Sequence, residues 1–181
     1  MRDLALDNPA WRFASELYGK PGVAPELLAQ QDEFGLDISL LLFCLWEMVD
    51  RRSRLTAAEL QELTSIATPW KAMVVQRLRA ARRQLKTAPC VSWPAVAEFR
   101  VALQRMEIQS ERLQIALLFE WAERRAAPVA GNDGEPITGD VLDRVLEACG
   151  GKGGTRSLDH LRVALGLPPL GGIGSREASG A

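Results

Sequence analysis

The chain has 181 residues, of which 47% are hydrophobic and 25% are charged, and its formal net charge at pH 7 is −1. These values are typical of a globular protein of one domain with a sizeable core, and they predict no global attraction to nucleic acid or membranes. The charge is uneven, because it sums to −5 over residues 1–63, +6 over residues 64–127 and −2 over residues 128–181. A basic surface is therefore expected in the middle third.

Cysteine use and hydropathy indicate the compartment. The three cysteines are odd in number, widely separated and without a C-x-x-C pair, which fits a reducing cytosol rather than a disulfide framework. Asp3 and Asp7 interrupt the N-terminal segment, so it lacks the apolar core of a signal peptide. The longest apolar run, LLLFCLW at residues 40–46, is far shorter than the roughly 20 residues that cross a bilayer. The pattern predicts a soluble cytoplasmic protein without a membrane partner.

Helix start and stop signals bound three segments near the N-terminus. Residues 8–19 begin with a capping asparagine and a first-turn proline and end at glycine. Residues 25–35 repeat the order of proline first and glycine last. Asp37 is the expected N-cap of DISLLLFCLWEMVDRR, which is apolar on nearly all sides and is therefore predicted to be the central buried helix. A short buried strand over residues 39–45 is an alternative that periodicity alone leaves open.

Further helices are predicted in the middle of the chain. TAAE at residues 56–59 is a capping box that opens a helix to about residue 67. Thr68 and the proline after it are expected to start a new helix, and Ser92 is expected to do the same for the next one. Residues 94–126 form one long helix or two helices with a bend. Heptad-like spacing, with Ser110 as a gap, joins Phe99, Leu103, Met106, Leu113, Leu117 and Trp121.

The C-terminal part contains shorter elements. The loop PVAGNDGEP follows a helical bundle core at residues 1–127, and residues 128–166 hold this loop and two short helices capped by Thr138 and Ser157. Residues 167–181 are rich in glycine, proline and serine and are expected to form a disordered tail. The predicted fold is all-α, with a compact bundle of about six helices, a C-terminal helical pair and that tail.

The sequence contains no complete motif for catalysis or metal binding. His160 is the only histidine and is expected to be solvated or locally hydrogen-bonded. GGKGGTRS at residues 150–157 departs from a phosphate-binding loop, because Lys152 is followed by two glycines and a helix, not a strand, precedes it. No nucleophile motif is present. The sequence leans against an enzyme and predicts no cofactor and no metal.

The stretch PWKAMVVQRLRAARRQLK, residues 69–86, holds six basic residues and no acid. On a helix at 100° per residue, one stripe is apolar and the basic residues occupy an arc about 120° wide. A binding face for an acidic protein or another anionic partner is therefore predicted, and the first hypothesis is a non-catalytic helical interaction protein or adaptor. The predicted face consists of Arg79, Arg82, Arg83 and Lys86.

The same basic face has a structural interpretation. Glu107 and Glu111 lie one turn apart on the following helix, with Gln114 on the same stripe, and they can neutralise cations within the fold. We expect a divided outcome, in which Arg82 or Arg83 pairs inside the bundle while the other two cations, Arg79 and Lys86, stay in solvent.

Two further hypotheses compete with the interaction protein. An RNA- or DNA-binding module could use the same helix, although interleaved aromatic residues for base stacking are missing. A small-ligand binder or enzyme could instead use a pocket between helices. The residues predicted to line that pocket are Trp11, Tyr18, Trp46 and Trp70. The partner, the ligand and the oligomeric state are not encoded in any motif.

Three segments carry a resemblance to a known family. NPAWRFASELYGKPGVAPELLAQQDEFGLDISLLLFCLW, PWKAMVVQRLRAARRQLK and MEIQSERLQ, in this order and spacing, resemble the proteobacterial family of domain of unknown function 2390 over roughly residues 8–120. The resemblance implies a bacterial cytosolic protein with a variable C-terminal region. It supplies no activity, cofactor or catalytic residue, and the family often has Asn at the position of Ser39.

Overall fold

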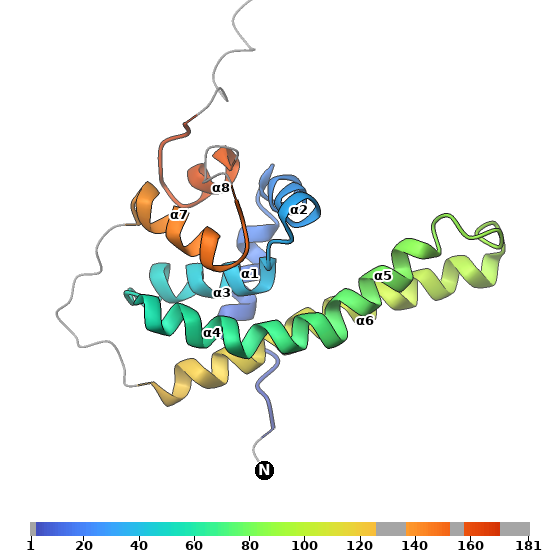
Figure 1. Ribbon diagram of the computed structural model, residues 1–181, viewed down its shortest axis with the longest axis horizontal. Helices are drawn as coiled ribbons and strands as arrows, with labels where there is room; N and C mark the ends of the chain where they lie inside the picture. The colour runs from blue at the N-terminus through green and yellow to red at the C-terminus, as the bar shows by residue number, and fades with distance from the viewer. Residues whose placement is uncertain (1–2, 126–136, 153–157, 171–181) are drawn as a thin grey trace, which may run out of the picture.

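A computed structural model describes residues 3–125, 137–152 and 158–170. Within these ranges every regular element is a helix (Figure 1), so the predicted all-α fold is confirmed. None of the helices in the described ranges is long and apolar enough to cross a membrane. The boundary expected at residues 127 and 128 lies outside the described residues and stays a prediction.

Helices α1 and α3 begin at the side chains that the sequence indicated, whereas α2 begins two residues before the predicted start at residue 25. Helix α1 (Pro9–Tyr18) is capped by Asn8, whose side chain accepts a hydrogen bond from the backbone N–H of Trp11. Helix α2 (Val23–Phe34) ends at Gly35, which has a φ of 79° that favours glycine. Helix α3 (Ile38–Val49) is capped by the Asp37 carboxylate. The alternative of a strand over residues 39–45 is therefore wrong.

The middle of the chain is more continuous than expected. Helix α4 (Ala57–Trp70) starts with the predicted capping box of Thr56 and Glu59. It runs through Pro69 into a π-helical turn, η1 (Lys71–Val75), and then into helix α5 (Gln76–Gln84). The prediction that Thr68 caps a new helix is wrong. A proline removes one backbone hydrogen-bond donor, and here a wide π-helical turn follows it instead of a break in the helix.

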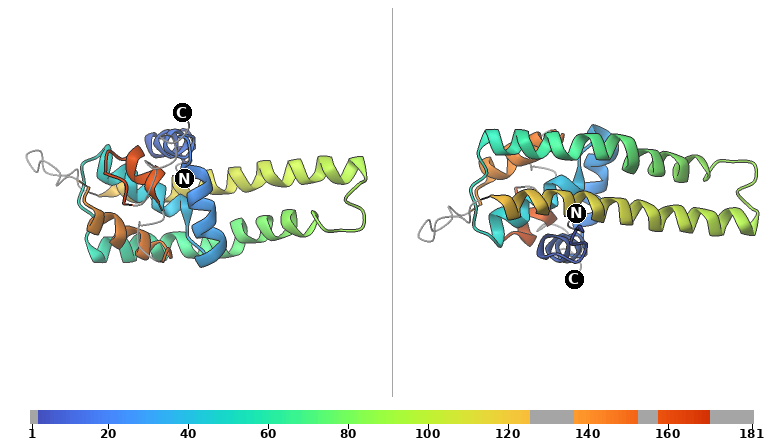
Figure 2. Two further views of the ribbon diagram at one scale, coloured as in Figure 1. Left: turned by 90° about the horizontal axis from the view of Figure 1, so that it is seen from above. Right: turned by 90° about the horizontal axis from the view of Figure 1, so that it is seen from below.

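Helix α6 (Pro94–Arg124) is one unbroken helix. Ser92 does not cap it, because the N-cap is Trp93 and no side chain bonds there. Figure 2 shows α4, η1 and α5 running antiparallel beside α6 and extending well beyond the other helices. We call the projecting part, residues 76–109, the arm, and the remaining helices the body.

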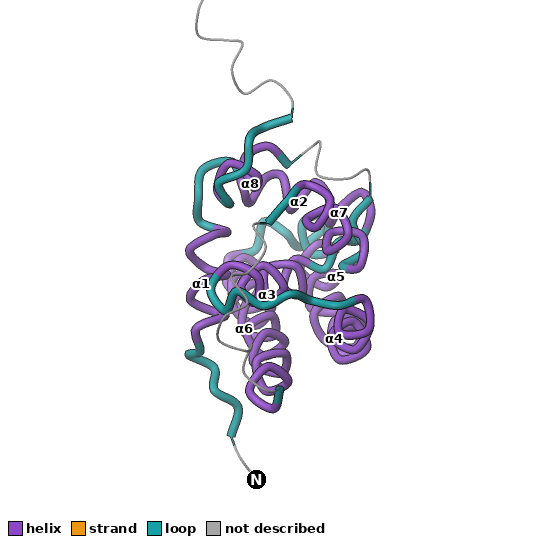
Figure 3. Tube along the Cα trace, turned by 90° about the vertical axis from the view of Figure 1, so that its left-hand side faces the viewer, coloured by secondary structure: helices purple, strands orange, loops and turns teal. Residues whose placement is uncertain are grey.

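The core lies around α3, whose residues from Ser39 to Glu47 are all buried. Figure 3, viewed along the arm, shows α4 and α6 below α3, and α2, α7 (Gly139–Ala148) and α8 (Asp159–Ala164) above it. Thr138 caps α7 as predicted. The C-terminal pair is not peripheral, because fully buried side chains such as Leu142 and Leu161 belong to the same core as α3.

Arg125 fastens the body end of α6. Its guanidinium donates to Ser53 Oγ at 2.8 Å and lies 3.3 Å from Glu47 and 2.7 Å from Glu59. Burial raises the pKa of Glu47, although Arg51 and Arg125 act in the opposite direction. This ion-pair cluster links α3, α4 and the end of α6.

The predicted disordered tail begins with residues that contact the body. Leu167 is partly buried against the core, and the Arg162 side chain donates to the carbonyl of Pro168 at 2.8 Å. The backbone N–H of Leu170 donates to Asp159 at 2.6 Å. Residues 171–181 lie outside the described residues, so the disorder predicted for them is untested. Ser157, the predicted cap of the last helix, also lies outside the described residues.

Candidate arginine cluster and corner pocket

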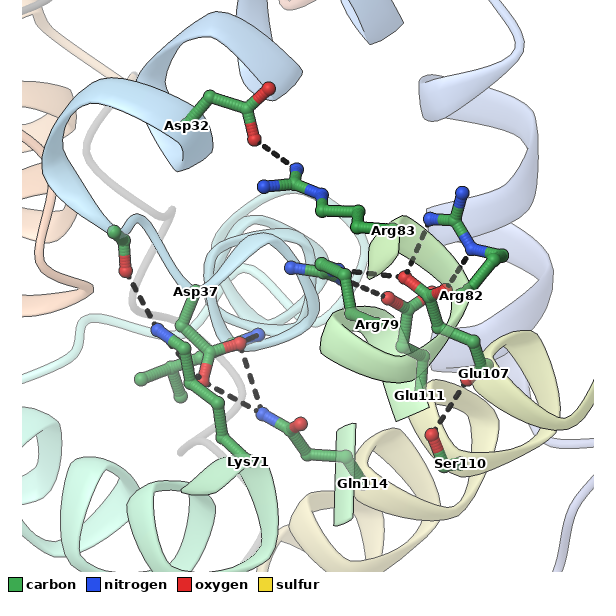
Figure 4. A network of polar contacts seen from close by, with 12 residues as sticks. Asp32, Asp37, Lys71, Arg79, Arg82, Arg83, Glu107, Ser110, Glu111 and Gln114 are labelled. Carbon is green, nitrogen blue, oxygen red and sulfur yellow. Dashed lines mark hydrogen bonds and ion pairs between the residues drawn. The ribbon is translucent and has the colours of Figure 1, made fainter. Parts of the chain in front are cut away.

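A cluster of arginine and glutamate side chains joins α5 to α6 where the arm leaves the body (Figure 4). Arg79 donates from Nε to Glu107 at 2.7 Å and from Nη2 to Glu111 at 2.6 Å. Arg82 donates from Nε and Nη2 to the two oxygens of Glu107, at 2.6 and 3.3 Å. The side chain of Arg79 is only 14% exposed. Glu107 is thus the common partner of two guanidinium groups.

The basic face is therefore divided differently from the prediction. The expected pairing of Arg82 is confirmed, but the expectation that Arg79 stays in solvent is wrong. The reason is that Arg79 lies on the side of α5 that packs on α6, next to two glutamates of that helix. The sequence of α5 alone does not define which of its sides packs on α6. Arg83 pairs with Asp32 of α2, and both side chains are about half exposed. Lys86 is exposed and pairs with none of the described residues.

Gln114 does not join the arginine cluster. Its Nε2 donates to both carboxylate oxygens of Asp37, at 3.0 and 2.9 Å. Lys71 lies 3.9 Å from the same carboxylate and donates to the carbonyl of Gly35 at 2.7 Å. This buried network, also drawn in Figure 4, connects the start of α3 to both segments of the antiparallel helix hairpin, which are α4–η1–α5 and α6.

The two glutamates of the cluster differ electrostatically. Burial favours a raised pKa for Glu107, but hydrogen bonds from Arg82 and Arg79 outweigh it, and the pKa is lowered. Burial also raises the pKa of Glu111, and here the single partner Arg79 does not reverse the effect. Burial and the nearby Glu111 raise the pKa of the Tyr18 phenol. The hydrogen bond to Glu107 raises the pKa of Arg82, so this cation stays charged.

The difference between the glutamates predicts the order of their protonation. As the pH falls from neutral, Glu111 should take up a proton first and Glu107 last, because their pKa values lie on opposite sides of the ordinary value of 4.5. Carbon-detected NMR of the two side-chain carboxyl groups measures both titrations. The reverse order would show that Glu111, not Glu107, receives the stronger hydrogen bonds.

A pocket of about 570 Å³ lies beside the cluster, in the corner between the arm and the body. Its volume falls in the range of ligand sites, roughly 300–1,000 Å³. Side chains from five elements meet there: α1, α2, α3, α5 and α6. The apolar part of the lining includes Trp11, Tyr18, Leu28, Ile38, Leu42 and Ile108, and the charged part is Arg79, Arg82, Arg83, Glu107 and Glu111.

The structure separates the four aromatic residues that were predicted to share a pocket. Trp11 and Tyr18 line the corner pocket. Trp46 is instead buried in the core, where its ring lies 5.5 Å from that of Phe119. Trp70 lies between the two helices of the hairpin and donates from Nε1 to the carbonyl of Ser110 at 2.8 Å. Trp46 and Trp70 are part of the scaffold of this corner.

Two kinds of residue were missed from the sequence, namely apolar residues that line the pocket and the acid that pairs with Arg83. Leu28 and Ile108 are exposed apolar residues of α2 and α6. An exposed apolar position in the sequence of one helix does not indicate that another helix lies opposite it. Asp32 is the second omission. The net charge of −5 over residues 1–63 shows that acids are plentiful there, but it does not indicate which of them pairs with the basic face.

The remaining sequence candidates are outside this site. His160 is partly solvated, with a side chain that is 44% exposed, and its Nδ1 lies 2.7 Å from Glu26 of α2, which is far away in the chain and not a local partner. The backbone N–H of Lys152 lies 3.4 Å from the Gln30 side chain, and residues 153–157 of the glycine-rich loop are not among the described residues. The described ranges contain no group of three or more His, Cys, Asp or Glu side chains suited to hold a metal ion.

Comparison with known proteins places the chain in a family. No curated protein and no solved structure matches it. A family model described as "Protein of unknown function (DUF2390)" matches residues 9–118. This match spans α1 to most of α6 and includes the arginine cluster and every element that lines the corner pocket. The chain therefore belongs to the DUF2390 family.

Proposed function

We propose that this protein is a helical binding protein whose corner pocket takes a small aromatic or branched aliphatic molecule that carries a carboxylate. The observation behind the proposal is that apolar side chains of α1, α2 and α3 and three arginines of α5 line one 570 Å³ pocket. An apolar lining with a few convergent polar groups is the usual composition of a ligand site.

The hydrogen-bond donors of the pocket support an anionic ligand. Three arginines and two glutamates line it, and Asp32, which is outside the lining, pairs with Arg83, so the formal charges of the cluster balance. Arg79 and Arg82 use Nε and Nη2 for the glutamates, and Arg83 uses Nη2 for Asp32. In each of the three, Nη1 donates to none of the described residues. Guanidinium N–H groups of this kind suit a carboxylate acceptor.

Calorimetric titration with three probes of similar shape tests the proposal. These are 1-naphthoate, 1-naphthalenemethanol and 1-naphthylmethylamine, which are anionic, neutral and cationic at neutral pH. We expect affinity to fall in that order. Arg83→Gln should weaken binding of 1-naphthoate roughly tenfold, the effect of losing one charge-assisted hydrogen bond, and should leave the neutral probe unchanged.

Lys86→Gln is the matched control, because it removes an exposed cation of the same helix region that does not line the pocket. It should leave all three affinities unchanged. Equal affinity for the three probes, or an equal loss in Arg83→Gln and Lys86→Gln, would contradict the proposal and indicate non-specific attraction.

A second candidate is the binding of an acidic protein surface by the arm. The observation that favours it is that Arg77, Lys86 and Arg105 are exposed and form no ion pair with a described residue. Anisotropy measurements with a labelled poly-glutamate peptide and a labelled single-stranded RNA compare this candidate with nucleic-acid binding. Tighter binding of the peptide, lost in Lys86→Gln and weakened by salt, supports the protein partner. Tighter binding of the RNA would favour a nucleic-acid module.

A further inference from the structure

The arm has an apolar face on the side opposite the corner pocket. Phe99 and Met106 of α6 are both 57% exposed. Met106 is two residues from Gln104 and from Ile108, which line the pocket, so it points about 200° away from them around the helix. The view from below in Figure 2 shows α4 and α6 in front of the other helices of the body, and α5 projecting with α6 beyond it, with no other described element crossing the outer part of the arm.

This face, which we call the lower face, is a regular stripe and not a scatter of single residues. Phe99, Ala102 and Met106 are spaced as positions a, d and a of a heptad, the pattern of a helix packed against a partner helix. All three are exposed. Ala102 lies midway between the other two, and its small side chain permits close approach of a second helix.

Charges beside the stripe repeat with the same spacing. Glu98 and Arg105 each directly precede one of the two large apolar residues, so both lie on the same flank of the lower face. Both are exposed, and neither forms an ion pair within the described residues. The midpoint between Glu98 and Arg105 along α6 lies near Ala102, and so does the midpoint between Phe99 and Met106.

We propose that the lower face binds a second copy of this chain, with the two arms antiparallel around a two-fold axis at Ala102. In this arrangement Phe99 of each copy packs on Met106 of the other, and Glu98 of each copy pairs with Arg105 of the other. In an antiparallel helix pair, residues on one flank of the first helix lie beside residues on the same flank of the second helix. The charges of these residues determine which helices pair and in which orientation. An isologous contact needs this kind of self-complementary patch.

The area available is sufficient for such a contact. The first 20 or so residues of α6 span about 30 Å, and two helices packed about 8–10 Å apart present a face about 18 Å wide. Face-to-face packing then covers roughly 500 Å² of each copy, or about 1,000 Å² together, which reaches the lower limit of specific interfaces. The bodies lie at opposite ends of the pair, and the corner pockets face outward.

Sedimentation velocity of the full chain over a wide concentration range tests the proposal. We expect a reversible equilibrium between monomer and dimer. Met106→Glu should abolish the dimer, whereas Val163→Glu, at a 52% exposed apolar residue of α8, should leave it unchanged. Circular dichroism of both variants checks that the helices remain.

Charge reversal tests the two-fold arrangement itself. Glu98→Arg and Arg105→Glu each turn two attractive pairs into two repulsive ones, so each variant should dimerise roughly tenfold more weakly. An equimolar mixture of the two variants should recover the lost affinity, because every pair is then attractive in the mixed dimer. The double variant E98R/R105E should dimerise like the original chain and shows that neither substitution harms folding.

Each of the following results would overturn the proposal: a chain that stays monomeric at every concentration, a dimer that Met106→Glu leaves intact, or a mixture of the two reversed variants that dimerises no better than either alone. Binding of another acidic protein at the lower face by a monomeric chain would also overturn it, and would assign the face to that partner.

Discussion

Replacing Glu107 by Gln is expected to lower the free energy of unfolding by about 3 kcal/mol at neutral pH. The substitution keeps the size of the side chain but removes the carboxylate that accepts hydrogen bonds from Arg79 and Arg82. Removing one partner of a buried ion pair costs about 3–5 kcal/mol, because the other charge stays buried and unpaired. The lower end applies here, since the Arg82 side chain is 21% exposed. Urea unfolding measures the loss.

Asp32→Asn is the matched control for this variant. It removes the carboxylate that pairs with Arg83, but both side chains of that pair are about half exposed. Exposed pairs contribute about 0–1 kcal/mol, so the control should change the unfolding free energy by no more than that. Equal losses in the two variants would show that the Glu107 cluster acts as an ordinary surface pair.

The stability difference between the original chain and Glu107→Gln should depend on pH. The pKa of Glu107 is lower in the folded chain than the ordinary value of 4.5. Its ionised form therefore stabilises the fold fully above the pKa of the unfolded chain, and this contribution is lost as the pH falls through the lower folded pKa. The difference between the two proteins should be constant near neutral pH and should shrink below about 4.5. A difference that grows on acidification would contradict the lowered pKa.

The second large effect is expected in the centre of the body. Leu45→Ala should lower the free energy of unfolding by about 2–5 kcal/mol, the cost of removing a buried leucine side chain and leaving a cavity. Leu45 is fully buried in α3. Leu28→Ala, at a 42% exposed leucine of α2, is the control and should cost less than about 1 kcal/mol. A similar loss at both sites would mean that α3 is not the centre of the core.

Local sequence chemistry was sufficient to predict the helices and most of their ends. A capping side chain such as Asn8 or Thr56 bonds to a backbone N–H only three residues away, so its effect is contained in a short segment. Where a second interaction competes, the local prediction fails. Pro69 was expected to begin a helix, yet α4 continues through it.

The candidate site was predictable only in part. The composition of residues 69–86 indicated a basic helix, and Glu107 and Glu111 could be named as partners because they repeat at one helical turn. The pocket was predicted with four aromatic residues, of which Trp11 and Tyr18 line it. The wheel of one helix orders its residues around the axis, but it contains no information about which side another helix will cover.

The all-α class, the burial of α3 and the presence of a basic helix could be predicted from the sequence, because periodicity and capping act within a few residues. What each helix face meets could not be predicted in this way. The heptad-like stripe of α6 is half-buried at Leu117, yet exposed at Phe99 and Met106. Likewise, Arg79 is neutralised by two glutamates, while Lys86 pairs with none of the residues that the structure describes. Such differences depend on helices far apart in the chain, and packing selects their positions through apolar burial and charge pairing that no single segment contains.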